Sequence, residues 1–318
     1  MLRTVTGPVR VAAVNGAVLP HEHLRTDMRW AVGVDSDPHR WLDEEHTVAA
    51  ELRELRHSDD LGLVVELTCL GMGRDPASLA RIAAGSRVPV VASTGLFAEP
   101  FTNVGDQDVD TLTGLLMDEI LSGVDGTGVF PGVIGEVGSW GAEPTPREER
   151  CLVAAGRAAL QSRLPVATHG RSPLSLLEIL LGQNLPGSRV AVGYAGADLG
   201  AARKIAEAGA YVSLGVLALG SDQAARIALG LIEDGHAERL LISTGLSRVG
   251  HMQKYGGPGY AQLFHAVLPR LRESGVEEDT IRLITHDNPL RWLAGGLGRP
   301  VPQTRLTATD VKVADFGA

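Results

Sequence analysis

The strongest chemical signal in the sequence is a pair of histidines separated by one glutamate, in the stretch PHEHLRTD that begins at Pro20. His21 and His23 follow the apolar run GAVL, which favours a β-strand. Residues i and i+2 of a strand point to the same face, so both imidazoles project to one side and Glu22 projects to the other. Two adjacent imidazoles suit zinc or a similar divalent ion. An isolated pair of this kind is often incidental, so the fold must supply further ligands.

Eight short apolar runs recur along the chain and alternate with segments of helical periodicity. The runs span residues 16–23, 63–69, 88–94, 132–138, 164–170, 189–195, 210–216 and 239–245. Each is nearly continuous in apolar residues, as expected of a parallel strand that is buried on both faces. The clearest helical segments span 47–62, 147–163, 199–209 and 221–236. This alternation predicts an α/β fold, a (β/α)8 TIM barrel formed by a single domain.

The 318-residue length suits one such barrel with a short extension. Residues 1–300 are assigned to the barrel, and segments 260–275 and 277–296 are expected to be helices that close it. Residues 301–318 are polar and weakly patterned, which predicts a loose C-terminal tail. The sequence contains no linker or internal repeat that would divide the chain.

The C-terminal ends of barrel strands face the active site, so residues at these ends are the candidate site residues. His169 lies near the end of the fifth predicted strand, and Glu136 lies in the fourth, in GVIGEVG. Together with His21 and His23 they supply three nitrogens and one carboxylate, a complete set for one zinc ion. A bound metal lowers the pKa of its water from ~15.7 toward ~7 and so supplies hydroxide at neutral pH. Hydroxide is the nucleophile that a hydrolase needs. The alternative for Glu136 is an ion pair with Arg171, because a buried carboxylate needs a cation or an arginine.

Composition argues against several other classes of protein. The net charge of −9 opposes a nucleic acid or an anionic membrane as the main partner. No apolar run reaches the ~18 residues of a membrane-spanning helix, and the N-terminus lacks a clean signal-peptide core. The two cysteines, Cys69 and Cys151, form no CxxC pair and fit a reduced, cytoplasmic protein. The expected partner is therefore a small-molecule substrate.

Several motifs together resemble the phosphotriesterase-like branch of the amidohydrolase superfamily, over nearly the whole chain. They are TVTGPV followed by GAVLPHEHL, VVELTCLGMGRDPASLARIA, VASTGLF, GVIGEVG, ATHGRS, LLISTGLSR, YGGPGY and DNPLRWLAG. The resemblance implies six metal-ligand positions for two metals. Four of these positions are matched by His21, His23, Glu136 and His169, with the glutamate replacing a carbamylated lysine.

The other two positions depart from the family pattern. The sixth-strand histidine falls at Tyr194, and the eighth-strand aspartate, which handles the proton of the attacking water, falls at Gly245. The resemblance therefore implies a degenerate site with about one Zn²⁺ per chain and argues against a second metal. Glu136, if it does not bind the metal, is then the nearest candidate for the catalytic base, and His251 and Asp198 are others. Tyr194 is a candidate donor to a developing oxyanion.

The favoured interpretation is a mononuclear metal-dependent hydrolase that acts on an ester, lactone or amide bond. Two alternatives on the same fold stay open. One is a metal-independent or repurposed biosynthetic enzyme, such as an isomerase, lyase or cyclase, and the other is a catalytically silent ligand binder. The resemblance implies a homodimer, whereas the residues themselves leave the oligomeric state open.

Long loops after the predicted strands would set the substrate specificity. The segment 249–260 carries glycines suited to a mobile lid. Four basic residues are candidates for an anionic substrate group, namely Arg74, Arg171, Arg248 and Lys254.

Overall fold

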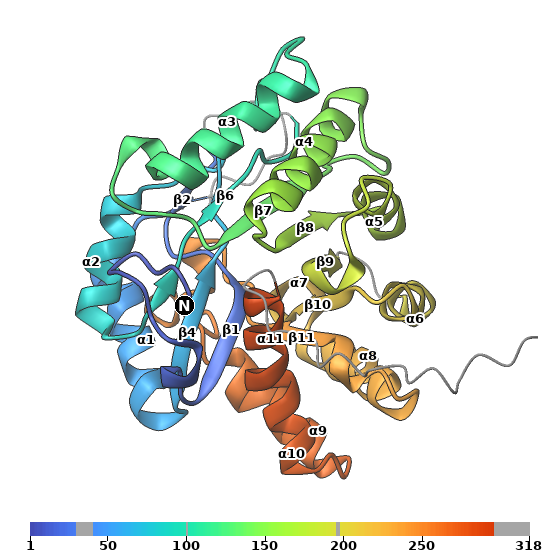
Figure 1. The fold of residues 1–318 in the computed structure, drawn as a ribbon. Helices are drawn as coiled ribbons and strands as arrows, with labels where there is room; N and C mark the ends of the chain where they lie inside the picture. Colours follow the sequence, from blue (N-terminus) through green and yellow to red (C-terminus); the bar gives the residue numbers. More distant parts are fainter. Residues whose placement is uncertain (30–40, 100, 195–197, 296–318) are drawn as a thin grey trace, which may run out of the picture.

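A computed structural model describes residues 1–29, 41–99, 101–194 and 198–295 of the chain (Figure 1). It shows a ring of parallel strands surrounded by helices, which confirms the predicted TIM barrel. The barrel strands are β1 Ala17–Glu22, β4 Leu61–Glu66, β5 Val90–Val91, β6 Ser93–Thr94, β7 Val133–Gly138, β8 Val166–Gly170, β9 Val190–Tyr194, β10 Tyr211–Gly215 and β11 Leu240–Ser243. A small antiparallel pair, β2 Thr26–Asp27 and β3 Trp41–Leu42, lies outside the barrel sheet. All eight predicted strands are present, and the third consists of the successive pieces β5 and β6.

Helices follow the strands around the outside of the ring (Figure 1). They are α1 Glu45–Ser58, α2 Pro76–Ser86, α3 Val109–Ser122, α4 Pro146–Ser162, α5 Pro173–Leu181, α6 Leu199–Glu207, α7 Val216–Leu219, α8 Ser221–Glu233, α9 Leu268–Glu273, α10 Glu278–Arg282 and α11 Asn288–Ala294. Local sequence explains where several begin. The Asp75 carboxylate caps α2, and Thr145 and Glu148 form a reciprocal capping box at α4.

The barrel strands pair in parallel in two runs, β1–β4–β5 and β6–β7–β8–β9–β10–β11. Because β5 and β6 are successive pieces of one strand, the chain itself joins the two runs. Side chains and loop backbone connect β11 to β1: the Ser243 hydroxyl accepts from the N–H of His21 at 3.1 Å, and the carbonyl of Leu246 accepts from the N–H of His23 at 3.1 Å. The two histidines therefore lie at the seam where the ring closes.

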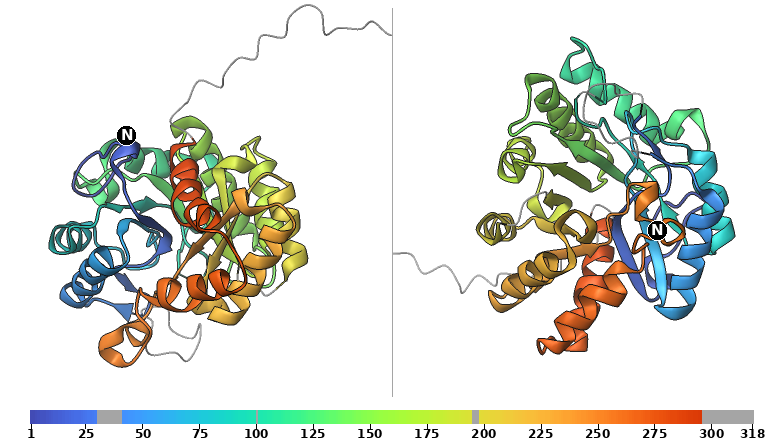
Figure 2. Two further views of the ribbon diagram at one scale, coloured as in Figure 1. Left: turned by 90° about the horizontal axis from the view of Figure 1, so that it is seen from below. Right: turned by 180° about the vertical axis from the view of Figure 1, so that it is seen from behind.

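Two hydrophobic layers fix which strand residues face inward. An inner cluster inside the ring includes Val18, Leu63, Val133, Ala167 and Leu241, and an outer cluster packs the strands against the helices. Leu290, Trp292 and Leu293 of α11 join the inner cluster, and the left view of Figure 2 shows α11 lying across one end of the ring. This helix covers the end of the barrel opposite to the histidine pair. Residues 301–318, predicted as a loose tail, lie outside the described residues.

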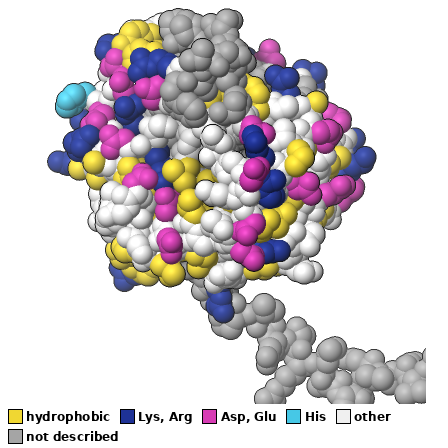
Figure 3. All heavy atoms as spheres, turned by 90° about the horizontal axis from the view of Figure 1, so that it is seen from above, with side chains coloured by type: hydrophobic (Ala, Val, Ile, Leu, Met, Phe, Trp, Pro, Cys, Tyr) yellow, Lys and Arg dark blue, Asp and Glu magenta, His cyan; other side chains and the backbone are white. Residues whose placement is uncertain are grey.

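The surface carries charges of both signs. On the face in Figure 3, acidic and basic side chains are interspersed, with scattered apolar side chains between them. Among the described residues, no helix combines the length and the apolar character that crossing a membrane requires.

Candidate metal centre

Glu136 points into the barrel because β7 contains an irregularity. Val133 packs in the inner cluster and Ile134 in the outer one, so strict alternation would send Glu136 outward. The pairing register of β7 with β8 shifts between Ile134 and Val137, which gives β7 one extra residue there. Such a bulge re-aims the following side chain. The buried Glu136 side chain consequently reaches the histidines instead of the helix layer.

Only glycine fits immediately before Glu136. Gly135 has φ +142°, and a Cβ built on it would lie 2.4 Å from the carbonyl oxygen of Ala167 on β8. A side chain would therefore collide with the neighbouring backbone and force the two strands apart. The glycine allows β7 to stay paired with β8 while it carries Glu136 inward.

Three imidazole nitrogens surround the Glu136 carboxylate. His21 Nε2 lies 3.0 Å from Oε1, His169 Nδ1 lies 3.2 Å from Oε1, and His23 Nε2 lies 3.5 Å from Oε2. Ligand atoms of His21, His23 and Glu136 all lie within 4.8 Å of one another. Ligands of a tetrahedral zinc ion, at ~2.1 Å from the metal, are separated by about 3.4 Å, so these spacings suit a single ion.

The group is closed on one side and accessible on the other. His21, His23 and Glu136 are buried, whereas the His169 side chain is 35% exposed. A substrate or solvent molecule would therefore approach the carboxylate past His169.

The electrostatics of the site favour an anionic Glu136. Burial opposes ionisation of Glu136, but His169, His21 and His23 outweigh it and hold the pKa of this carboxyl below its usual range. Burial lowers the pKa of His23 to about 4. Burial also disfavours a charged His21, but the adjacent Glu136 carboxylate outweighs burial and raises the pKa of that ring.

Two further carboxylates, Glu22 and Glu66, are fully buried beside the site. Burial raises the pKa of Glu22 to about 6 and that of Glu66 to about 8. Burial therefore disfavours the charged form of both groups, and Glu136 is the carboxyl of the site that is held anionic.

Comparison with known proteins decides the family. The model of the phosphotriesterase family matches residues 1–293. The chain belongs to the phosphotriesterase family. The phosphotriesterase homology protein of Escherichia coli K12 is 30% identical over 288 residues, which cover 87% of this chain and 97% of that protein. Human N-acetyltaurine hydrolase is 28% identical over 256 residues, which cover 73% of each chain.

Solved structures agree with this assignment. The crystal structure of the E. coli phosphotriesterase homology protein, complexed with phosphate in its active site, superposes with a TM-score of 0.83 at 28% identity. The match covers 88% of this chain and 99% of that chain. A lactonase from Listeria monocytogenes has the same fold, with a TM-score of 0.83 at 21% identity. The family therefore includes proteins named as hydrolases, as the sequence motifs implied.

This phosphotriesterase-family chain departs from the six-ligand pattern at two positions, and both lie at the ends of barrel strands. Tyr194 ends β9, and its side chain lies outside the described residues. Gly245 follows β11 with φ +71°, and its N–H donates to Glu22. His251, proposed as a base, is half-buried at the end of the 3-10 turn Val249–His251. It lies outside the group formed by His21, His23 and Glu136.

Glu22, to which the sequence assigned no role, holds the loop that follows β11. Its Oε1 accepts from the Ser243 hydroxyl at 2.7 Å and from the N–H groups of Thr244 at 2.7 Å and Gly245 at 3.0 Å. Its Oε2 accepts from the N–H of Leu246 at 2.8 Å. The sequence does place Glu22 on a strand that is buried on both faces. A buried carboxylate needs several hydrogen-bond donors, which was a sign that Glu22 has a structural role. Sequence alone does not show where these donors lie.

Replacing Glu22 by glutamine should lower the free energy of unfolding by about 2 kcal/mol. The amide NH₂ group would replace one carboxylate oxygen, and the N–H donors that this oxygen accepted from would lose their acceptor. Urea unfolding of the metal-free protein at pH 8 measures the change. Glu278→Gln, at a solvent-exposed ion pair with Arg272, is the control and should barely move the midpoint. Equal midpoints for wild type and Glu22→Gln would contradict the clamping role.

The segment predicted to be a lid contacts α1 and its N-cap in this structure. The Glu51 carboxylate accepts from the N–H of Gln253 at 2.9 Å, and Lys254 Nζ donates to Glu44 at 2.8 Å. Glu51 lies in α1 and Glu44 is its N-cap residue, so the segment 249–260 contacts this helix at two points. Sequence gives no sign of these contacts, and the mobility of the segment stays a prediction from its glycines.

Two of the four candidate anion-binding residues are committed to other partners. Lys254 is one of them, through its contact with Glu44. Arg74 is the other. Its side chain is 4% exposed and donates hydrogen bonds of 2.9 Å to both Glu119 and Asp125. Arg171 is exposed and Arg248 is half-buried.

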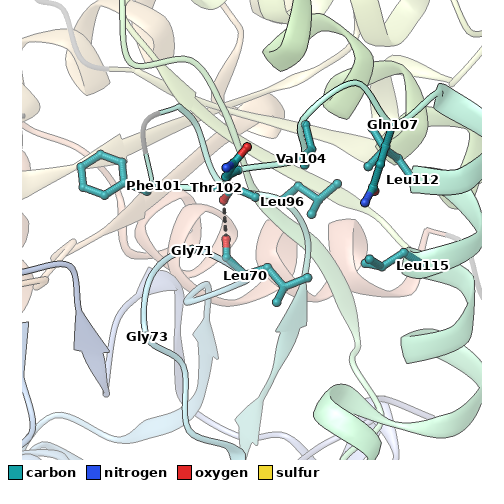
Figure 4. Close-up of a pocket in the computed structure, with 11 residues that line it drawn as sticks. Leu70, Gly71, Gly73, Leu96, Phe101, Thr102, Val104, Gln107, Leu112 and Leu115 are labelled. Carbon is teal, nitrogen blue, oxygen red and sulfur yellow. Dashed lines mark hydrogen bonds between the residues drawn. The ribbon is translucent and has the colours of Figure 1, made fainter. Parts of the chain in front are cut away.

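A separate apolar cavity of about 450 Å³ lies between α3 and the segments after β4 and β6 (Figure 4). Leu70, Leu96 and Val104 line it, and the Thr102 hydroxyl donates to the Leu70 carbonyl at 2.9 Å. The residues around the Glu136 carboxylate take no part in its lining. This cavity is therefore distinct from the candidate metal centre.

Proposed function

We propose that this protein is a mononuclear metal-dependent hydrolase that cleaves a carboxylic ester, lactone or amide. The observation that supports the proposal best is the set of three imidazole nitrogens within 3.0–3.5 Å of one buried carboxylate. Such a donor set suits zinc, which binds nitrogen and oxygen ligands in tetrahedral geometry. A small-molecule substrate, a cytoplasmic location and a homodimer belong to the same proposal, without nucleic acid or membrane as partners.

The donor chemistry of these residues fits the ion. His21 Nε2, His23 Nε2, His169 Nδ1 and a Glu136 oxygen would hold it, and the anionic Glu136 would offset part of its charge. When bound, the ion supplies an acidic water and polarises the scissile carbonyl. The family's eighth-strand aspartate is absent at Gly245, so a neighbouring group must accept the proton of the attacking water. Glu136 and His251 are the proposed acceptors, with Tyr194 as the proposed donor to the developing oxyanion.

The relatives guide the choice of substrate. N-acetyltaurine, named in the human relative, contains an amide bond, so N-acyl amines and amino-sulfonic acids should be screened with esters and lactones. The phosphate in the active site of the E. coli relative makes inorganic phosphate a useful inhibitor probe.

Replacing Glu136 by glutamine should lower hydrolysis by ~10²-fold or more, because the site loses the charge that binds the ion or accepts a proton. Initial rates on the best substrate of the screen, with zinc content per chain, measure the effect. Glu143→Gln is a matched control, because Glu143 is an exposed carboxylate that follows the same strand and binds Ser172. An unchanged rate for Glu136→Gln would remove this residue from the mechanism.

A second candidate is metal-free acid–base chemistry, and the contact between His21 and Glu136 favours it. At 3.0 Å the two groups can share a proton, and the pKa of His21 is raised beside this carboxylate. Purified protein that keeps full activity after exhaustive chelation, with no metal detected, would support this candidate against the hydrolase.

A further inference from the structure

Tyr260, the last residue of the segment 249–260, is fully buried and hydrogen-bonded to a residue of the candidate metal centre. Its Oη donates to the carbonyl of His23 at 2.7 Å. Its N–H donates to Glu51 Oε2 at 3.2 Å, and its carbonyl accepts from the Thr244 hydroxyl at 2.8 Å. Tyr260 therefore connects the end of β1, the helix α1 and the loop after β11.

The backbone of His23 is held by the chain that follows β11. β1 ends at Glu22, so His23 lies one residue beyond the strand. Its N–H donates to the carbonyl of Leu246 at 3.1 Å, and its own carbonyl accepts from Tyr260. These two contacts orient the peptide planes on either side of the histidine. Because a functional side chain must be placed to within about 0.5 Å, these planes decide whether the His23 ring reaches the site.

Packing alone does not explain the hydroxyl of Tyr260. Phenylalanine would fill the same space, and a buried hydroxyl costs free energy unless it finds an acceptor. The acceptor that it finds is the backbone of a candidate metal ligand. The direction of this bond is fixed, since a carbonyl oxygen can only accept.

We propose that Tyr260 is a positioning residue whose hydroxyl holds His23 in its ligating conformation and so couples the segment 249–260 to the candidate metal centre. The Glu51 carboxylate holds the other side of this connection, because it accepts from the N–H groups of Gln253 at 2.9 Å and of Tyr260 at 3.2 Å. A displacement of the segment is thereby transmitted to His23 through one hydrogen bond. The effect on metal binding rests on the proposed function, whereas the placement of the His23 ring does not.

Tyr260→Phe removes the hydroxyl and keeps the aromatic ring. Zinc affinity should fall by ~10-fold or more, as it does when other groups that orient a metal ligand are removed. The visible absorption spectrum of the cobalt-loaded protein should change too, because it reports the arrangement of ligands around the ion. A purely structural role would lower the stability and leave both the zinc affinity and the cobalt spectrum unchanged.

Two other tyrosines provide matched controls. Tyr255→Phe removes a phenolic hydroxyl from the same segment, where it donates to Glu44. Tyr211→Phe removes the hydroxyl of a buried tyrosine at the start of β10, in the inner hydrophobic cluster. Both variants should keep the zinc affinity and the cobalt spectrum of the wild type.

The metal-free protein supplies an independent measurement. NMR of histidine-labelled protein gives the χ1 rotamer populations and ring resonances of His23, which His23→Gln identifies. Both should change in Tyr260→Phe and stay as in the wild type in Tyr255→Phe.

Unchanged His23 rotamers in folded Tyr260→Phe would overturn the proposal, and so would an unchanged zinc affinity where the wild type binds zinc. If Tyr260→Phe unfolds, Thr244→Val takes its place with the same measurements. It removes the hydroxyl that holds the Tyr260 carbonyl, and it should weaken zinc binding in the same direction but by less. Altered His23 rotamers in a protein that binds no zinc would support this inference but count against the proposed hydrolase.

Discussion

Replacing His21 and His23 together by alanine is expected to abolish stoichiometric metal binding and to lower hydrolysis by ~10³-fold or more. The two rings supply two of the three nitrogens around Glu136, and both are buried, so solvent cannot replace them without reorganising the site. The remaining pair, His169 and Glu136, would offer too few ligands to hold zinc tightly. Elemental analysis of untagged protein measures the metal, and initial rates measure the activity.

Removal of two other histidines provides the control. His57 and His265 are exposed residues on helical segments outside the group of His21, His23 and Glu136, and His265 pairs with Asp59 at 3.2 Å. His57→Ala/His265→Ala should keep about one zinc per chain and the wild-type rate. If His21→Ala/His23→Ala retained its metal, the ion would have to be held elsewhere and the assigned site would be wrong.

The absence of metal from wild-type protein, even after reconstitution with zinc, would redirect the interpretation. The contact between His21 and Glu136 would then be an acid–base pair, and the alternatives of metal-free catalysis or ligand binding would apply.

The sequence predicted the fold well because the barrel depends on a repeated local pattern. Eight apolar runs are short and separated by helical segments, and each appears as a barrel strand. Placing His21, His23 and His169 at one end of the barrel followed from strand order and from their positions near strand ends. These rules need only the order of elements along the chain.

Features that depend on contacts between distant segments were not predictable in the same way. The bulge that turns Glu136 inward requires the register of β7 against β8. The four hydrogen bonds to Glu22 come from residues more than 200 positions away, and the anchors of the segment 249–260 lie on α1. Glycine content at 249–260 predicts flexibility, but it gives no indication that this loop contacts Glu44 and Glu51. A local pattern carries no information on such partners.

Restoring the two altered ligand positions should add a second metal. The variant Tyr194→His/Gly245→Asp would supply the histidine and aspartate that the family pattern places after the sixth and eighth strands. We expect zinc content to rise from about one to about two per chain at saturating metal, because the added imidazole and carboxylate complete the vacated half of the site. Titration followed by elemental analysis measures the stoichiometry.

The backbone at Gly245 permits this test at a modest cost. A Cβ there would lie 3.3 Å from the Gly215 Cα, which is tight but tolerable, and aspartate accepts a φ of +71° better than most residues. Strain at this dihedral should cost about 1 kcal/mol of stability. The Gly245 N–H bond to Glu22 can persist, since it involves only the backbone.

The matched control is Tyr194→His/Gly245→Asn, which has the same shape and backbone strain but lacks the added charge. This variant should stay near one zinc per chain, since a neutral amide is a weak ligand beside a carboxylate. Two metals in the aspartate variant and one in the asparagine variant would show that the missing charge limits the natural site. One metal in both would mean that the second half of the pocket has changed beyond its two ligand positions. The binding of a single metal would then be a property of the whole pocket. The catalytic base would have to be a residue at a different position from the family's eighth-strand aspartate.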